Sequence, residues 1–362
     1  MNRFVLLDGK PVVVYPTENQ TIPSSYPYFQ PPYNYLLGSV FTLLSIWSVL
    51  GNLLVLLIVT RYKRMRTRTN ILLANLATID LMTGLLAVPF SAITAFNGGW
   101  VLGETACQVN GFLNALFAAA SIHSLMYISI HKYWSTKNIF SDGSPVRRII
   151  VMISAAWIWG LLFGTALVTG WTRIEYKTGT TQCGPKNPER GNAREVSHSI
   201  LTSSTNFLIP LLVILYCYTA VFRIFRRSVS RLVEQDYWQS LSEKHLLARQ
   251  RKIAITLIII FVAFLLCLAP YIAYSTTIAL FKDKTRVPSV FNPVAYIFLY
   301  LSSCINPVIY AFRSRELSAA YQKILRMLCC DASQLCKTSF SSSRTGKRKC
   351  FLLTVSWIKI NL

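Results

Sequence analysis

One carboxylate stands out in this chain because it lies inside a long apolar segment. Asp80 is the single acidic residue within the segments that we predict below to cross a membrane, and the other thirteen of the 14 acids lie in connections or termini. A charge in that setting is costly and normally faces the interior of a helical bundle. Oxygen atoms around a carboxylate suit a small hard cation such as Na⁺, or a proton. A polar network that holds no ion is the alternative. Helical spacing brings five polar residues within reach of Asp80: Asn52, Ser121, Ser302, Ser303 and Asn306.

A second polar feature lies at the end of the last apolar segment, in the stretch 302–312. A proline inside an apolar helix removes a backbone hydrogen bond and bends the helix. In a membrane the carbonyl freed by Pro307 needs another partner, and Asn306 with its neighbouring serines is suitable. Taken alone, this stretch is either a packing kink or a hinge in a signalling bundle.

The sequence does not favour an enzyme, a metal centre or a nucleic-acid-binding protein. An intramembrane enzyme needs a nucleophile with a base, or paired acids, and a lone carboxylate supplies neither. The nine cysteines form no Cys-x-x-Cys pair and no Cys/His ligand cluster. The net charge of +23 sits in short connections and the tail, which indicates membrane topology and not a groove for DNA.

Composition and hydropathy place these residues in an all-α membrane protein. Hydrophobic residues make up 53% of the 362, charged residues make up 14%, and the mean hydropathy is +0.42. A soluble domain carries about 25% charged residues. A membrane-spanning helix needs about 20 apolar residues. Seven segments without a basic residue in their interior meet that length: 35–60, 70–96, 105–131, 148–171, 197–222, 253–281 and 288–312.

The distribution of basic residues sets the orientation and the domain organisation. One set of connections, with the tail, holds 27 Lys and Arg, and the opposite set holds ten. We therefore expect a multi-pass plasma-membrane protein with its N-terminus extracellular and its C-terminus cytoplasmic. The sequon at Asn19 falls on the outer side, as N-glycosylation requires. The expected parts are an extracellular N-terminus (1–34), a seven-helix bundle (35–312), an amphipathic helix (313–330) and a disordered cytoplasmic tail (331–362).

Two pairs of cysteines invite modification. Cys107 and Cys183 both fall on the outer side, where disulfides persist, and we expect them to pair; two free thiols are the alternative. Cys329 and Cys330 follow the amphipathic stretch, which we expect to lie on the inner membrane face against anionic lipid. Both are candidates for palmitoylation, with unmodified thiols as the alternative.

Several short motifs follow one another along these segments: Gly51-Asn52, Leu76-Ala77-Thr78-Ile79-Asp80, Trp157, Pro210 with Tyr218, Cys267-Leu268-Ala269-Pro270 and Asn306-Pro307-Val308-Ile309-Tyr310. Taken in order, they resemble a class A, rhodopsin-like G protein-coupled receptor over about 35–330. The resemblance implies a heterotrimeric G protein as partner, an extracellular ligand, and arrestin and receptor kinases acting on the Ser/Thr-rich tail. It implies the same Cys107–Cys183 pair, and a switch in which Tyr310 swings toward Tyr218 as the helix bends at Pro307.

The third segment departs from the family pattern. It ends in His131-Lys132-Tyr133 where the family has Asp-Arg-Tyr. Lysine lacks the planar fork of arginine, and histidine, which is mostly neutral at pH 7, supplies no carboxylate. Two hypotheses follow: a loosened resting state with high basal signalling, or weak coupling to G protein.

The outer half of the bundle also departs from the family pattern. Leu268 replaces the tryptophan of the sixth segment, and Asn114 stands where amine receptors carry an aspartate. Tyr300 stands where opsins carry the retinal lysine, so a retinal-binding opsin is excluded and a classical amine receptor is disfavoured. The ligand expected is a small neutral or lipid-like molecule, or part of a peptide. The residues expected to line its pocket are Asn114, Phe117, Ala118, Leu268, Tyr271, Tyr274, Tyr296 and Tyr300.

A polytopic transporter or channel is the alternative class. Such proteins usually show internal repeats or several polar helices, and this sequence shows neither. A receptor is therefore the interpretation that the sequence favours, with no cofactor expected beyond the Na⁺ that Asp80 suits.

Overall fold

We describe a computed structural model of the chain. The residues described are 3–7, 10–14, 29–137, 146–186, 192–232, 237–280, 288, 290–313, 318–319 and 322. The chain divides into two units, Met1–Arg313 and Ser314–Leu362. In the described part of the chain, seven helices are long and apolar enough to cross a membrane. The all-α prediction with seven spans is thus confirmed.

The first four spans consist of five helices and a short helical turn. The second span is split in two by a break at Ala87, and the residues between the first two spans form a single 3₁₀ turn. The elements are α1 (Tyr33–Arg61), η1 (Lys63–Met65), α2 (Arg68–Leu86), α3 (Val88–Phe96), α4 (Gly103–Lys137) and α5 (Val146–Val168).

The last three spans include longer helices than the sequence predicted. The fifth span begins earlier, contains one π-helical turn, and continues well past residue 222, while the helix of the sixth begins sixteen residues before 253. The apolar pattern missed these extensions because their residues are polar and basic. The elements are α6 (Ala193–Ser203), η2 (Ser204–Leu208), α7 (Ile209–Leu232), α8 (Tyr237–Leu280) and α9 (Phe291–Arg313).

Two antiparallel hairpins complete the described elements. One joins β1 (Arg3–Leu7) to β2 (Lys10–Val14), within the segment expected to be the N-terminus. The other joins β3 (Ile174–Tyr176) to β4 (Cys183–Pro185), in the connection between α5 and α6. Asn19, Cys329 and Cys330 lie outside the described residues, as does nearly all of the expected amphipathic helix.

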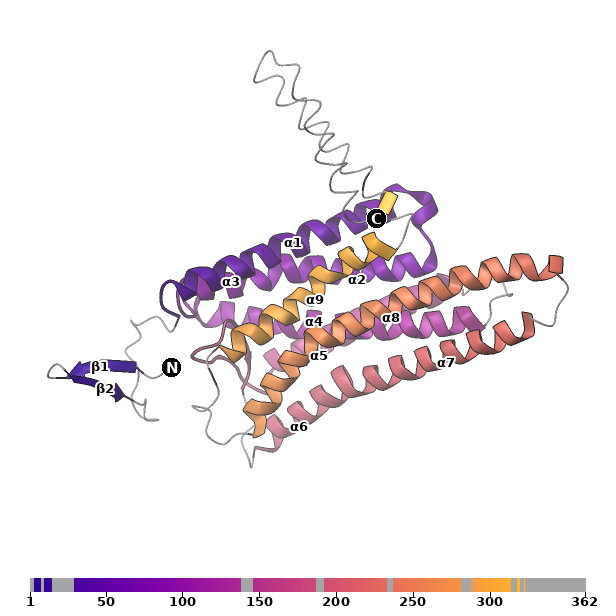
Figure 1. Ribbon diagram of the computed structural model, residues 1–362. Helices are drawn as coiled ribbons and strands as arrows, with labels where there is room; N and C mark the ends of the chain where they lie inside the picture. The colour runs from indigo at the N-terminus through magenta and orange to yellow at the C-terminus, as the bar shows by residue number, and fades with distance from the viewer. Residues whose placement is uncertain are drawn as a thin grey trace, which may run out of the picture. The chain divides into compact units, whose positions relative to one another are not determined.

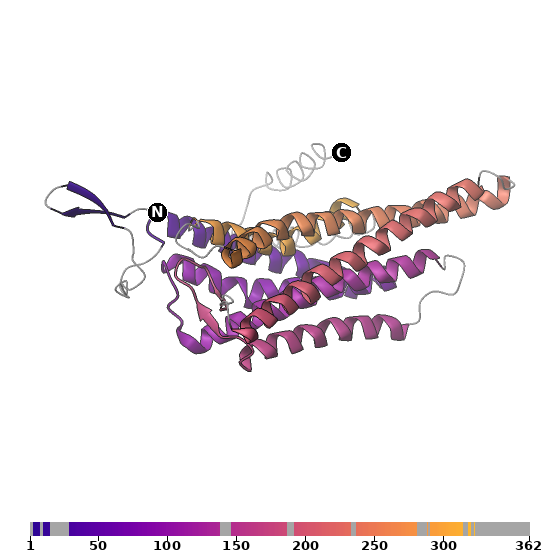
Figure 2. The ribbon, with the colours of Figure 1, turned by 90° about the horizontal axis from the view of Figure 1, so that it is seen from below.

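The long helices run along one common axis, and α4 lies at the centre of the bundle (Figures 1 and 2). It packs against α2, α5, α7 and α8, and both strands of the β3–β4 hairpin lie against it. We call the end of the bundle that holds this hairpin the disulfide end. The other end, where α4 carries His131, Lys132 and Lys137, we call the basic end. At that end α7 and α8 extend beyond the other helices (Figure 1).

The distribution of side chains is that of a membrane protein. Large apolar residues point outward: Leu36 is 64% exposed and Leu266 is 67% exposed. Polar residues are buried instead, with Asn52 at 0% and Asp80 at 1%. An apolar exterior around a polar interior suits lipid and not water, because lipid has no hydrogen bonds to offer.

Glycines allow α4 and α5 to approach closely. A Cβ added at Gly160 would lie 2.7 Å from the carbonyl oxygen of Leu116, and one at Gly164 would lie 2.9 Å from the ring of Phe112. Small residues at helix contacts are the usual means of tight packing in membranes. The contact fixes α5 against the central helix.

Candidate functional site

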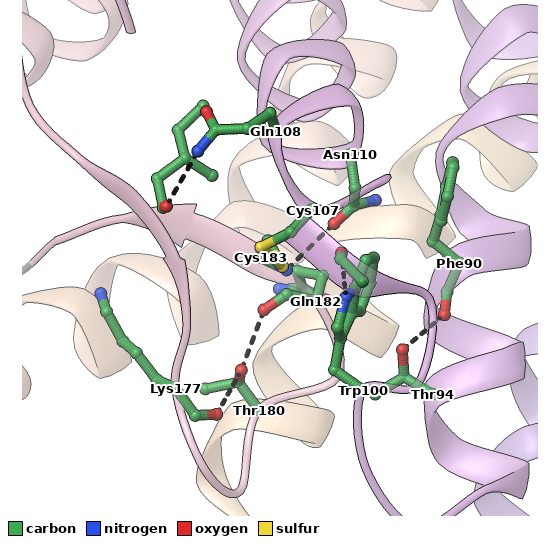
Figure 3. The surroundings of a disulfide bond; sticks show 12 residues. Phe90, Thr94, Trp100, Cys107, Gln108, Asn110, Lys177, Thr180, Gln182 and Cys183 are labelled. Atoms are coloured by element: carbon green, nitrogen blue, oxygen red, sulfur yellow. Dashed lines mark hydrogen bonds between the residues drawn. A yellow bond between two sulfur atoms is a disulfide. The ribbon is translucent and has the colours of Figure 1, made fainter. Parts of the chain in front are cut away.

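The disulfide end is closed by a covalent bond between α4 and the loop above it. Cys107 on α4 is bonded to Cys183 on β4, across 76 residues of sequence (Figure 3). The backbone N–H of Cys183 also donates to Asn110 Oδ1 at 3.0 Å. The predicted pairing is confirmed, and the alternative of two free thiols is wrong.

The polar network around Asp80 joins three spans. Asn306 on α9 donates from Nδ2 to Asp80 Oδ2 at 2.8 Å. On α1, Ser48 donates to the backbone oxygen of Asp80 at 2.9 Å. Asn52 donates to the backbone oxygens of Ser48 at 2.8 Å and of Ser303 at 2.9 Å. The structure therefore brings Asn52, Ser303 and Asn306 together near the carboxylate.

Two other residues of the predicted network do not take part in these contacts. Ser302 donates to the carbonyl of Leu299 on its own helix at 2.6 Å, so its hydroxyl is already used. Ser121 is half-buried on α4 and makes no hydrogen bond to Asp80 in the described part of the chain. Helical spacing alone did not show which of these serines would contact Asp80. The rotamer of Ser302 and the position of α4, which carries Ser121, determine that neither does.

The chemistry of this network suits a small cation. Asp80 is buried and supplies carboxylate oxygens, while Asn52 Oδ1 is buried without a hydrogen-bond partner. Both residues contact Ser48 of α1, Asp80 through its backbone oxygen and Asn52 through its side-chain amide. A carboxylate and an unpaired amide oxygen in one buried network are the kinds of ligand that a hard cation would coordinate.

A tyrosine cluster lies nearer the disulfide end. Tyr300 donates from its hydroxyl to Asn114 Oδ1 at 3.0 Å, which joins α9 to α4. The ring of Tyr296 lies 5.3 Å from that of Tyr271 and 6.0 Å from that of Tyr300. Asn114 Nδ2 is buried without a hydrogen-bond partner. These four residues of the predicted pocket are brought together.

The remaining predicted pocket residues lie in other surroundings. Phe117 belongs to a buried cluster with Ile79 and Ala87 of the second span. Ala118 is exposed and Leu268 is half-buried. Tyr274 packs against Phe291, with 5.6 Å between ring centroids. Phe117 and Ala118 lie one turn of α4 further from the disulfide end than Asn114. At that level Phe117 packs on Ile79 of the second span instead of on the tyrosines.

Four residues near the tyrosines were missed by the sequence analysis. Gln182 Oε1 accepts from the hydroxyl of Ser91 on α3 at 3.2 Å, and the Thr181 N–H donates to Asn292 Oδ1 on α9 at 3.2 Å. The Ser91 and Tyr300 hydroxyls are 3.4 Å apart. One signal in the sequence could have found Gln182. It is next to Cys183, and a residue next to a disulfide cysteine must lie close to the helix that holds the other cysteine.

The basic end contains the residues of the expected switch. His131 is 3% exposed and Lys132 is 2% exposed, so both are buried within the bundle. Tyr133 packs against Tyr216 of α7, with 6.1 Å between ring centroids. The structure places the His-Lys-Tyr stretch at the junction of α4 and α7.

Two more residues of the expected switch lie on α7 and α9. The ring of Tyr218 lies 6.1 Å from that of Phe261 on α8. Tyr310 is 2% exposed and follows Pro307 within the continuous α9. Both tyrosines therefore lie on helices that pack against α8.

The comparison with known families decides the class of protein. The sequence model described as "7 transmembrane receptor (rhodopsin family)" matches residues 51–310, which is most of the chain. The chain belongs to the rhodopsin family of seven-transmembrane receptors. It is therefore a multi-pass membrane protein of a receptor family.

Several curated relatives of this rhodopsin-family receptor match over most of their length. A pinopsin of Columba livia is 28% identical over 77% of this chain and 76% of the pinopsin. The high-affinity lysophosphatidic acid receptor of Xenopus laevis is 29% identical over 81% and 82%. The histamine H2 receptor of Canis lupus familiaris is 26% identical over 84% and 83%.

A solved structure shares the fold of the receptor. The crystal structure of squid rhodopsin superposes with a TM-score of 0.75, covers 82% of each chain and is 23% identical in sequence. At that identity the likeness concerns the arrangement of the helices. The transporter or channel alternative is not favoured by any of these matches.

Proposed function

We propose that this rhodopsin-family receptor carries a signal from an extracellular ligand to a heterotrimeric G protein by rearrangement of its helices. The observation that carries the proposal is the position of two contacts on one helix. On α9, Tyr300 bonds to Asn114 near the disulfide end, and Asn306 bonds to Asp80 deeper in the bundle. The two contacts are six positions apart on one helix, so we expect a shift of α9 at the first contact to move the second.

The orientation in the plasma membrane follows from charge and from the disulfide. The basic end belongs in the cytoplasm because basic residues are retained on that side. The disulfide end then faces outward, where a Cys107–Cys183 bond persists. Sugar at Asn19 outside, and palmitate at Cys329 and Cys330 inside, fit the same orientation.

The tyrosine cluster and Asn114 support a small neutral or lipid-like ligand, or part of a peptide. The cluster offers aromatic faces, hydroxyls and one unused amide donor, and Asn114 carries no charge with which to hold an ammonium group. The names of the relatives specify lysophosphatidic acid in one case and histamine in another. Because these ligands differ in chemistry, similarity does not choose between them.

A Na⁺ ion at Asp80 is the second part of the proposal. Asp80 and the unpaired Asn52 Oδ1 would hold it, and Ser303 and Asn306 lie in the same network. When bound, the ion would neutralise the buried carboxylate and tie α1 to α2. A shift of α9 that moves Asn306 would alter its site.

At the cytoplasmic end we propose that the replaced Asp-Arg pair lowers the cost of leaving the resting state. His131 supplies no carboxylate to hold its neighbour, so one contact that favours the resting state in the family is missing. A smaller energy difference between two states raises the population of the minor one. We therefore expect basal signalling.

The test compares the wild type with His131→Asp/Lys132→Arg in cells, at matched surface expression. The readouts are recruitment of several G protein subtypes and of arrestin, without added ligand and across a ligand library. A lower basal signal in the double variant supports the loosened resting state. A stronger response to ligand with unchanged basal signal supports weak coupling instead. Ion flux without recruitment of G protein or arrestin would contradict the receptor function and indicate a channel or transporter.

A further inference from the structure

The loop segment Thr180–Cys183 is buried more deeply than a surface connection should be. Thr181 is 0% exposed, Cys183 is 1%, Gln182 is 4% and Thr180 is 7%. Loops normally lie on the surface because their backbone groups need water. A buried polar segment must find its partners within the protein, and this one does.

Three polar groups of this segment are bonded to three different helices. Gln182 Oε1 accepts from Ser91 Oγ of α3 at 3.2 Å and from Thr181 Oγ1 at 2.8 Å. The N–H of Thr181 donates to Asn292 Oδ1 of α9 at 3.2 Å. The N–H of Cys183 donates to Asn110 Oδ1 of α4. Two adjacent residues and a cysteine thus bridge three spans.

The bridge continues into the tyrosine cluster. Ser91, which contacts Gln182, lies 3.4 Å from the hydroxyl of Tyr300, and Tyr300 donates to Asn114 at 3.0 Å. Gln182 is therefore linked through Ser91 to Tyr300 and Asn114. This is the same cluster that we proposed as the binding site of a diffusible ligand.

Covalent and apolar contacts hold the segment in place. The disulfide at Cys183 tethers it to α4 (Figure 3). The ring of Trp100 stacks between Phe90 of α3, at 5.9 Å, and Tyr176 of β3, at 6.2 Å. A tethered group acts at an effective concentration in the millimolar range, so weak contacts suffice for high occupancy.

We propose that Thr181 and Gln182 form a built-in agonist: a tethered segment that occupies the outer site and supports ligand-independent signalling. The inference rests on the proposed function, because it assigns the basal signal to a particular contact. The segment joins α3, α4 and α9 through the groups that a free ligand would use. A free ligand must displace Gln182 in order to reach Ser91 and Tyr300.

The first test measures basal signalling of Gln182→Ala, with Thr178→Ala as the matched control. Thr178 is exposed in the same loop, so its truncation leaves the contacts intact. Loss of one to two hydrogen bonds should lower the basal signal by about five- to tenfold at equal surface expression. The milder Ser91→Ala removes one bond from the helix side and should lower it in the same direction. An unchanged or increased basal signal in both variants would overturn the proposal.

The second test measures occupancy without any signalling. A Ser91→Cys receptor is treated from outside with a charged thiol reagent, and the same receptor with Gln182→Ala is treated in parallel. The reaction should be slow with the loop intact and at least about tenfold faster without Gln182, because the tethered side chain no longer covers position 91. Equal rates would overturn the proposal. If the rate rises while no variant and no wild type recruits G protein, the loop occupancy stands and the proposed coupling is what fails.

Discussion

Trp157 on α5 donates its indole N–H to Asn75 Oδ1 on α2 at 2.8 Å, and Asn75 in turn donates to Ser124 on α4 at 3.0 Å. The fourth-helix tryptophan is thus one member of a polar chain across three spans. Trp159, two residues later, donates instead to Asn206 in the fifth span. Trp157 therefore joins the fourth span to the second, while Trp159 joins it to the fifth.

Replacing Trp157 by Phe should destabilise the receptor. The Asn75 oxygen would lose its donor in a buried setting, at a cost of about 1–3 kcal/mol. The measurement is the thermal midpoint of detergent-solubilised receptor. Trp47→Phe is the matched control, since Trp47 is 57% exposed on the lipid side. Equal midpoints for the two variants would show that the bond to Asn75 contributes nothing.

Replacing Gly111 by Ala should displace the β3–β4 hairpin. An added Cβ would lie 2.6 Å from Ile174 Cγ2, which is closer than two carbons can approach. Overpacking of this kind costs about 1–3 kcal/mol. Gly99→Ala provides the control, because its Cβ would meet only the Tyr176 hydroxyl at 3.7 Å. Protease sensitivity of the loop in intact cells should rise for the first variant and not for the second.

Neutralising Asp80 should abolish any dependence of stability on sodium. The wild type should have a higher thermal midpoint in NaCl than in choline chloride at equal ionic strength, because Na⁺ binds only the folded protein. Asp80→Asn should give one midpoint in both salts. Asn306→Ala keeps the carboxylate and should retain part of the difference. Equal thermal midpoints of the wild type in the two salts would show that the Asp80 network holds no ion.

Removing the disulfide should loosen the disulfide end without unfolding the bundle. Cys107→Ser/Cys183→Ser frees the β4 strand from α4, so the buried Thr181 and Gln182 lose their tether. We expect a lower thermal midpoint and a lower basal signal than in wild type. The bond itself is checked by mass spectrometry of wild-type receptor that has been cut by protease between the two cysteines. The two peptides should separate only after reduction. Separation without reductant would contradict the bond.

Removing the Tyr300 hydroxyl should uncouple α9 from α4. Tyr300→Phe keeps the ring contact with Phe41, at 6.1 Å, but leaves Asn114 Oδ1 without its donor. We expect a several-fold change in basal or ligand-induced signalling together with a modest loss of stability of about 1 kcal/mol. Tyr35→Phe, at a 58% exposed position, is the control and should behave as wild type.

The spans and the disulfide were predictable because each depends on a local signal. Runs of apolar residues without Lys or Arg marked the seven helices, and the side of the membrane marked Cys107 and Cys183. The contact between Asn306 and Asp80 was also within reach, because a lone intramembrane carboxylate must find polar partners on neighbouring helices.

The rest depended on rotations and on a loop, which carry no local signal. Phe117 and Asn114 are three residues apart on α4, yet the first packs on Ile79 while the second bonds to Tyr300. Gln182 lies in a polar loop sequence that reads as solvated, and it is buried because the disulfide and the Trp100 stack hold it there. Its role follows from tertiary structure, not from its type or spacing.

The break in the second span determines which route connects the two ends of the receptor mechanically. Ala87 separates α2, which carries Asp80, from α3, which carries Ser91, and Pro89 in the first turn of α3 has no backbone N–H with which to restore the helix. Two rods joined by such a joint transmit torque poorly. Between the same two levels α9 is a single helix, with Tyr300 at one level and Asn306 at the other. Its Pro307 leaves the carbonyl of Ser303 without a helical donor, and Asn52 Nδ2 takes that place. Ser91 and Asp80 therefore share a contact with α9, a helix on which neither of them lies.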